Sequence, residues 1–415
     1  MTMTTEPVQS ALRRRRDDAV WLLSQLAAVP SEAGTSGESA QRIVGEYLSS
    51  AGYKVRYTID DPAAHADHAE YTAPPPGEPP VNLIAIPRAR SAPRLGLLAH
   101  VDTERAGAGW TGEPLRAICK DGRLYALGAA DNKSGLAAAA VAAVALSEAG
   151  RPAPVVMSVH AKGGGARGTL PAMLRAPALS AVLYVHATET GRGLTEIKHA
   201  TRGVLDFVVS VTGWHGPCQE IGTPESSRFS EGGDALAALM HVLGRLRTAP
   251  LADCDVNVGS VCAGERPGVV PIRAKAAIRA LFGAPHTGAI LLTRVDAELR
   301  RCAQELSSER GSFAVERPSV DFIANPGSSD WDGPFCRTVR EAVREITGVE
   351  PAPYGGHLAS DLRFPMRLRG IPAVGVGCRA GGFYGPDEWV DIDDLSRLIA
   401  TVTRVAQLWS ALEES

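Results

Sequence analysis

One segment constrains the fold more than any other, the run SGLAAAAVAAVALSEAG at residues 134–150. Its residues favour a helix, and small apolar side chains would cover every face of that helix. A helix that is apolar all round is buried all round. The chain must therefore place structure on each side of this helix, which favours a large α/β core.

Apolar stretches that are typical of buried strands lie on both sides of this helix. They read VNLIAIP (81–87), RLGLLAH (94–100), PVVMSVH (154–160) and AVLYVH (181–186). Because such strands alternate with helical segments, we predict an α/β fold with a central sheet that helices cover on both faces.

The pattern changes from about residue 199, where alternating strands and amphipathic helices follow one another in strand–helix–strand–strand–helix order. That order indicates a small inserted α+β domain. We therefore predict three parts along the chain: a first catalytic part at 1–198, an inserted lid domain at 199–320, and a second catalytic part at 321–415.

Composition excludes several classes of function. The net charge is −3 and aromatic residues make up 5%, so neither a basic field nor a stacking platform for nucleic acid is expected. No stretch reaches the roughly 20 apolar residues that span a bilayer. The N-terminus lacks the apolar segment of a secretory signal, and the seven cysteines include no CxxC pair. These features predict a cytoplasmic protein with reduced thiols and no membrane partner.

Polar side chains stand where the predicted strands end. His100 and Asp102 close one strand, while His160 and His186 close two others. Asp131 lies in GAADNKSG, at the start of the buried helix. Ligands bind beyond the carboxyl ends of parallel strands, so these residues are candidates for a site. A histidine beside a carboxylate is also the pattern of a metal ligand with its orienting partner.

Several motifs together resemble the M20 family of zinc aminopeptidases, carboxypeptidases and aminoacylases. They are NLIAIP, LGLLAHVDT, GWTGEPLRAICKDGRLYALGAADNKSG and GFYGPDEWVDIDDL, in family order over nearly the whole chain. The resemblance implies a catalytic domain that holds two zinc ions and an inserted lid, often used for dimerisation. It also implies that His100 and Asp131 bind metal, with Asp131 bridging, and that Asp102 orients the site.

The inserted domain carries two further residues of the family pattern. The segment GERPGVVP followed by AAIRA resembles the strand pair of the lid. There Arg279 falls where the family often holds a substrate carboxylate. His215, in VTGWHG, resembles the lid histidine that polarises the scissile carbonyl.

The pattern breaks at SVHAKGGGARG, residues 158–168. The family has two adjacent glutamates before a glycine turn, a base and a zinc ligand, and here Lys162 and Gly163 stand at those places. The next family ligand is an acid, and here that stretch reads YVHATET, with His186 or Ala187 nearest and Glu189 slightly displaced. The last is a histidine, where this chain has Tyr384. An ordinary two-zinc mechanism therefore does not follow from this sequence.

Three interpretations remain open. In the first, the chain is an enzyme that acts on an amide or related C–N bond of an amino-acid-derived small molecule. It hydrolyses that bond or catalyses transfer or cyclisation, and its rebuilt active site does not hold two zinc ions. At most one zinc is expected, held by imidazoles and a carboxylate. Its ligands would come from His100, Asp131, His160 and His186. Without metal, Lys162 would be the base or nucleophile. Tyr384 would donate a proton, and His357, in YGGHLASD, would contact the substrate.

The second interpretation is a protein without catalytic activity that binds a ligand or partner, with Lys162 replacing the charge of the metal. The third is an ordinary zinc-dependent amidohydrolase or peptidase with unusual ligands. In each case the resemblance implies a small amino-acid-derived ligand and a homodimer formed through the lid.

Overall fold

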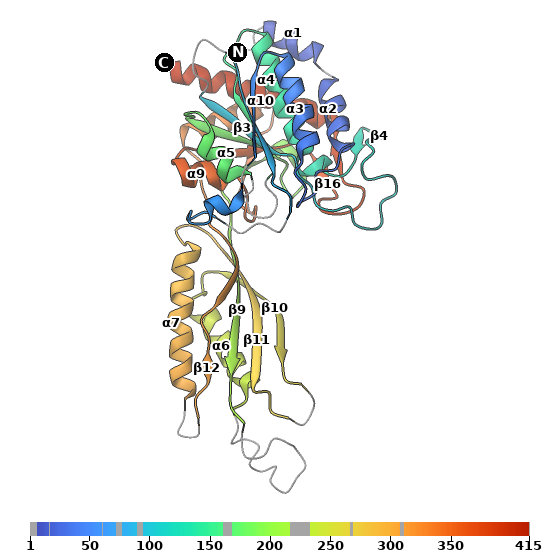
Figure 1. Cartoon of the computed structure of the whole chain (residues 1–415). Coiled ribbons are helices and arrows are strands. Elements are labelled where there is room, and N and C mark those ends of the chain that lie inside the picture. The colour runs from blue at the N-terminus through green and yellow to red at the C-terminus, as the bar shows by residue number, and fades with distance from the viewer. Residues whose placement is uncertain are drawn as a thin grey trace. The chain divides into compact units, whose positions relative to one another are not determined.

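The computed structural model describes residues 6–15, 17–59, 61–71, 77–88, 94–160, 168–215, 233–265, 269–307 and 311–414. Two compact units divide the chain (Figure 1). The first unit is formed by Met1–Thr201 and Gly327–Ser415, and the second by Arg202–Pro326. The inserted domain predicted from the sequence spans residues 199–320.

A mixed eight-stranded sheet forms the centre of the first unit. Its middle strands, in the order β6-β3-β7-β15, are parallel, so their carboxyl ends share one edge. In sheet order the strands are β1 (Lys54–Ile59), β2 (Val81–Ile86), β6 (Val155–Val159), β3 (Leu95–His100), β7 (Ala181–Val185), β15 (Ala373–Val376), β8 (Glu196–Lys198) and β14 (Ala352–Tyr354).

Helices pack on both faces of this sheet, because alternate strand residues point into two separate apolar clusters. One face carries α2 (Asp18–Ala27), α3 (Glu38–Ser50), α4 (Ser134–Glu148), α8 (Pro334–Thr347) and α10 (Ile392–Glu414), with α1 (Glu6–Arg14) against α4. The other face carries α5 (Thr169–Arg175) and α9 (Arg363–Arg369). The predicted α/β fold is confirmed.

Helix α4 is buried as its composition predicts, with every side chain from Ser134 to Leu146 inside the unit. It approaches the sheet closely because residue 135 is glycine. A Cβ atom at Gly135 would lie 1.9 Å from the carbonyl oxygen of Val185, at the end of β7. Among the described residues, no helix is both long enough and apolar enough to cross a membrane.

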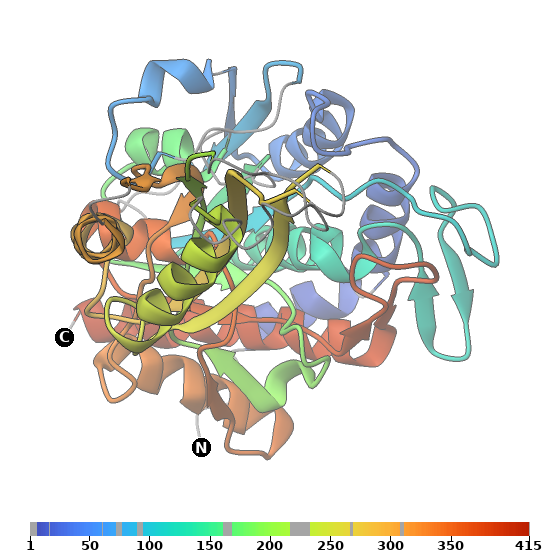
Figure 2. The same ribbon diagram turned by 90° about the horizontal axis from the view of Figure 1, so that it is seen from below.

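Shorter elements complete the first unit. A four-stranded sheet in the order β16-β17-β5-β4 projects at its rim (Figure 2). Its strands are β4 (Ile118–Lys120), β5 (Arg123–Tyr125), β16 (Ala380–Gly381) and β17 (Trp389–Asp391). Three single turns are η1 (Pro62–His65), the irregular turn η2 (Ala129–Lys133) and η3 (Gly193–Thr195).

The second unit has its own core between an antiparallel sheet and two helices. The strands run in the order β10-β11-β9-β12, with β13 also paired to β9. The elements are β9 (Gly203–Thr212), α6 (Ala235–Thr248), β10 (Asp255–Ala263), β11 (Arg273–Phe282), α7 (Gly288–Leu306), β12 (Ala314–Val315) and β13 (Ser319–Ala324).

Candidate metal centre

Three histidines stand at the shared carboxyl edge of the parallel strands. His100 is the last residue of β3, His160 follows β6, and His186 follows β7. All three side chains are buried. This edge is where open α/β sheets bind their ligands, and the apolar runs that precede each histidine explain why the strands deliver them there.

Asp131 joins two of these histidines. Its Oδ1 lies 2.8 Å from His100 Nε2 and 2.9 Å from His186 Nε2. The three donor atoms lie within 4.8 Å of one another, and all three residues are buried. We refer to His100, Asp131 and His186 as the first cluster.

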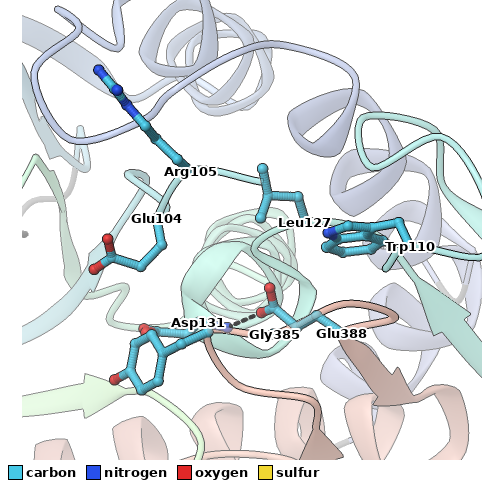
Figure 3. A pocket seen from close by; sticks show the side chains of 8 residues that line it. Glu104, Arg105, Trp110, Leu127, Asp131, Gly385 and Glu388 are labelled. Atoms are coloured by element: carbon cyan, nitrogen blue, oxygen red, sulfur yellow. Dashed lines mark hydrogen bonds between the residues drawn. The ribbon is translucent and has the colours of Figure 1, made fainter. Parts of the chain in front are cut away.

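The turn that carries Asp131 is held by a buried carboxylate. Glu388 accepts hydrogen bonds from the backbone N–H groups of Gly128 (2.7 Å), Ala130 (2.7 Å) and Asp131 (2.8 Å). Figure 3 shows Glu388 directed at the backbone of Asp131. Burial raises the pKa of Glu388 to about 7, against the effect of its backbone donors. Asn132 Nδ2 ties the same turn to the carbonyl oxygen of Val185, at 2.9 Å.

The donor atoms of the first cluster fit one zinc ion. Two imidazole nitrogens and one carboxylate oxygen form a common catalytic zinc set that leaves a position open. His100 is oriented for this role, because its Nδ1 lies 3.1 Å from the carbonyl oxygen of Asp102, and the Asp102 carboxylate is 3.5 Å away. With Nδ1 donating to that carbonyl, Nε2 is the atom left for a metal.

A second group of potential metal ligands shares His186. His186, Glu189 and His357 also offer donor atoms within 4.8 Å of one another. The ammonium of Lys198 lies among them, 2.8 Å from His186 Nδ1, 3.0 Å from Glu189 Oε1 and 2.9 Å from His357 Nδ1. We refer to His186, Glu189, Lys198 and His357 as the second cluster. A cation of the chain itself thus occupies the centre of this group.

Neighbouring charges and burial shift the pKa values of the two histidines in the first cluster in opposite directions. Burial alone lowers the pKa of His100, but the Asp131 and Asp102 carboxylates outweigh it and raise that pKa to about 10. Burial also lowers the pKa of His186, and there Lys198 adds to the effect while Asp131 opposes it. One histidine is therefore biased toward the charged form and the other toward the neutral form.

The second cluster shows the same competition between burial and charge. Burial raises the pKa of Glu189, but Lys198 and His357 outweigh it and lower that pKa to about 2. Burial lowers the pKa of Lys198 while Glu189 opposes the change, and burial with Lys198 lowers the pKa of His357. Glu189 and Lys198 form the charged pair of this group.

His160 lies beside the first cluster rather than in it. Its Nδ1 is 3.7 Å from Asp102 Oδ2, and among the described residues it is absent from both metal-binding groups. The described residues resume at Gly168, where a Cβ atom would lie 2.5 Å from the carbonyl oxygen of His160. Lys162 lies outside the described residues.

Tyr384 and His357, two further residues predicted for the site, both belong to the first unit. Tyr384 is 59% exposed and lines a small cavity. Asp131, Glu388 and Glu104 line the same cavity (Figure 3). His357 is predicted to contact substrate, and its Nδ1 already faces Lys198 and, at 3.1 Å, Glu189 Oε1. A role for His357 in substrate binding would therefore fall to its other ring nitrogen.

The two residues predicted from the lid pattern belong to the second unit. His215 is exposed beyond the end of β9. Arg279, on β11, binds Asp206 through two hydrogen bonds of 2.7 and 2.6 Å, and its side chain is 52% exposed. A substrate carboxylate would have to compete with Asp206 for this guanidinium, and both roles stay predictions.

Sequence reasoning missed two charged residues of the site. Glu388 stands in the quoted motif GFYGPDEWVDIDDL, and three backbone donors from the Asp131 turn account for its burial. Lys198 stands in the short strand β8, and its acceptor His357 is 159 residues away in the chain. The stretch around Lys198, LTEIKHA, also contains a threonine, a glutamate and a histidine, so its local sequence gave no signal that this lysine is buried.

Comparison with protein families gives one match that spans most of the chain. The model of peptidase family M20/M25/M40 matches residues 96–408. A succinyl-diaminopimelate desuccinylase from Zymomonas mobilis is 26% identical over 411 residues, which cover 96% of each chain.

Solved structures of similar fold are more distant in sequence. A tripeptidase from Staphylococcus aureus has a TM-score of 0.71 at 18% identity and covers 95% of this chain and 99% of its own. A dinuclear metal-binding peptidase of the M20 family from Bacillus subtilis has a TM-score of 0.60 at 14% identity and covers 96% and 98%. These structures agree with the α/β architecture described above.

Proposed function

Because the chain belongs to peptidase family M20/M25/M40, we propose that it hydrolyses an amide bond of a small amino-acid-derived molecule with one zinc ion. The observation that carries this proposal is the first cluster, in which His100 Nε2, Asp131 Oδ1 and His186 Nε2 converge. A zinc ion held there would supply Lewis-acid chemistry and activate water for hydrolysis.

The chain's own residues would hold and tune this site. Asp102 fixes the ring of His100 through its carbonyl oxygen, and Glu388 fixes the backbone that presents Asp131. Tyr384 lines the cavity next to Asp131, and we assign it the role of proton donor to the leaving amine. Lys162 takes the place of the family's general base, and we assign it the role of base.

The substrate that we propose is an N-acylated amino acid. The curated relative named above is a succinyl-diaminopimelate desuccinylase, and that name describes removal of a succinyl group from an amino group. Arg279 and His215 are our candidates for binding a carboxylate and the carbonyl of the substrate, and His357 is a separate candidate for substrate contact. We further propose a homodimer formed through the second unit, located in the cytoplasm.

Metal analysis combined with an activity screen tests this proposal. Protein purified without chelator should contain about one zinc per chain and should hydrolyse N-succinyl or N-acetyl amino acids. Asp131→Ala should lose both properties. His241→Ala is a matched control, because His241 lies on α6 of the second unit and contacts Glu305 there. Two zinc ions per chain would instead support an ordinary two-zinc hydrolase with unusual ligands.

A second candidate function is a metal-free protein that binds such a ligand without turnover. The observation that favours it is the Lys198 ammonium, which satisfies the second cluster without an ion. This candidate predicts no zinc and no hydrolysis, but a rise in melting temperature with N-acyl amino acids. Hydrolysis that persists without metal and disappears in Lys162→Ala would instead support lysine-based chemistry.

A further inference from the structure

We propose that Lys198 is a positioning residue that controls zinc binding through the tautomer of His186. This inference rests on the proposed zinc site at the first cluster. His186 is shared by both clusters, since its Nε2 faces Asp131 and its Nδ1 faces Lys198. The state of one ring nitrogen therefore constrains the other.

The surroundings of Lys198 define the donors and acceptors. The side chain is fully buried, and its Nζ has His186 Nδ1, Glu189 Oε1 and His357 Nδ1 at 2.8, 3.0 and 2.9 Å. An ammonium has three hydrogens to donate and no lone pair. With Glu189 as its counter-charge, Lys198 donates one hydrogen to each neighbour. The ring nitrogens of His186 and His357 can donate or accept according to tautomer, and in the arrangement that we propose both facing nitrogens accept and carry no hydrogen.

The tautomer of His186 follows from this. A neutral imidazole that accepts at Nδ1 carries its hydrogen on Nε2. That hydrogen is directed at Asp131 Oδ1, 2.9 Å away, so the pairing is satisfied. Nε2 is also the atom that would bind zinc in the first cluster. While Lys198 donates to Nδ1, His186 therefore has no lone pair to offer to the metal.

An alternative partner for the ring is already in place. The carbonyl oxygen of Ala187 lies 2.6 Å from His186 Nδ1. If the hydrogen were on Nδ1, it would point to this carbonyl, and Nε2 would have its lone pair free. His100 has a carbonyl acceptor at the corresponding place, since its Nδ1 lies 3.1 Å from the carbonyl oxygen of Asp102. The difference between the two ligands is the ammonium beside His186.

The expected change in zinc affinity can be estimated from other metal sites. The usual outer partner of a metal-binding histidine is an acceptor, such as a carboxylate or a carbonyl, and changing it alters metal affinity by 10–100-fold. At His186 the outer partner is a cation, which also repels the metal charge. Removing Lys198 should therefore tighten zinc binding by at least about tenfold.

Two variants with opposite expected effects test the proposal by competition with a zinc-binding chelator. Lys198→Met removes the cation and should bind zinc at least about tenfold more tightly than the native chain. Lys198→Arg keeps a cation that cannot lose its proton and should therefore bind zinc more weakly than the native chain. Lys54→Met is a control, because Lys54 is exposed on β1, and should leave the affinity unchanged. A role in packing alone would weaken binding in both cluster variants, and that result would overturn the proposal.

Nitrogen NMR of the His186 ring, assigned by its loss in His186→Gln, provides a second measurement that does not need Lys198→Met to fold. Metal-free native protein should show a hydrogen on Nε2 and none on Nδ1. In Lys198→Met the hydrogen should move to Nδ1 and donate to Ala187. A hydrogen on Nδ1 in the native metal-free protein would refute the mechanism.

Failure of this inference differs from failure of the proposed function. If the native chain binds one zinc ion and Lys198→Met binds it no more tightly, the inference is wrong and the zinc enzyme stands. If only Lys198→Met binds zinc, the inference holds and the native function is metal-free. If neither protein binds zinc, both are wrong.

Discussion

The two clusters of the first unit contain similar side chains but differ in what lies at the centre of each cluster. In the first cluster two imidazole nitrogens meet one carboxylate oxygen directly, at 2.8 and 2.9 Å. In the second, two imidazole nitrogens and a carboxylate oxygen surround the Lys198 ammonium. Ligand type alone therefore does not identify a metal site, because a cation of the chain can take the same position.

The clusters also differ in how they are held. The first depends on the irregular turn η2, whose backbone is fixed by Glu388. The second draws Lys198 from strand β8 and Glu189 from the chain just after β7, with His357 beyond β14. We therefore expect the first cluster to be sensitive to changes in that turn, and the second to changes in charge.

The largest effect should follow removal of the shared carboxylate of the first cluster. Asp131→Ala deletes one of three metal ligands, so zinc affinity should fall by more than the 10–100-fold that outer partners contribute. Amide hydrolysis should fall with it. Asp255→Ala, at an exposed ion pair with Arg202, is the matched control. Equal zinc content in Asp131→Ala and the native chain would contradict the first cluster as a metal site.

A smaller effect is expected when the turn beneath the first cluster is loosened. Glu388→Gln replaces one carboxylate oxygen with a donor that faces backbone N–H groups, and buried unpaired donors cost about 1–3 kcal/mol each. We expect a loss of about 2–4 kcal/mol in the free energy of unfolding, measured with denaturant, together with weaker zinc binding.

The control for this prediction is Glu38→Gln, which weakens an exposed ion pair with Arg42 on α3 and should cost about 0–1 kcal/mol. If both variants lost the same stability, Glu388 would not have the role in holding the turn that we assign to it.

The positions of the strand ends could be predicted from the sequence, because they follow from local patterns of apolar residues. Continuous apolar runs predicted the buried strands that end at His100 and before His160 and His186, and parallel pairing brings such ends to one edge. The fold class followed from the same pattern. The prediction of a metal site drew on these ends together with the family resemblance.

The contacts between segments that lie far apart in the sequence could not be predicted in this way. Lys198 meets His357 across 159 residues, and Glu388 meets the backbone of Gly128 across 260. Neither pairing leaves a periodic signal, since periodicity reports only which face of an element is buried. His160 shows that a strand end alone does not predict a metal ligand. Its strand ends at the expected edge of the sheet, but its ring lies against Asp102.

The two clusters should lose stability at opposite ends of the pH scale in metal-free protein. Against the effect of burial, Asp131 and Asp102 raise the pKa of His100 from 6.5 to about 10. That stabilisation is complete below about pH 6.5 and is lost as the pH rises through 10. Also against burial, Lys198 and His357 lower the pKa of Glu189 from 4.5 to about 2. That stabilisation is present above pH 4.5 and is lost as the pH falls through 2.

Melting temperature measured against pH after chelator treatment separates these contributions. His100→Gln should flatten the alkaline side of the profile, and Glu189→Gln should flatten the acid side. Each kcal/mol corresponds to about 2–4 °C in a unit of this size. Profiles that stay parallel to that of the native chain would show that neither charge pair contributes in the assigned range.

The smallest effect should come from His357→Ala, which changes the second cluster without touching the first. Lys198 would keep Glu189 and His186 as acceptors, so its hydrogen bond to His186 Nδ1 should persist. Zinc affinity measured by chelator competition should therefore change by less than about threefold, well below the range for a direct outer partner. A change of tenfold or more would mean that His357 acts on the metal itself. The two clusters would then be one binuclear site rather than a metal site and an ammonium site.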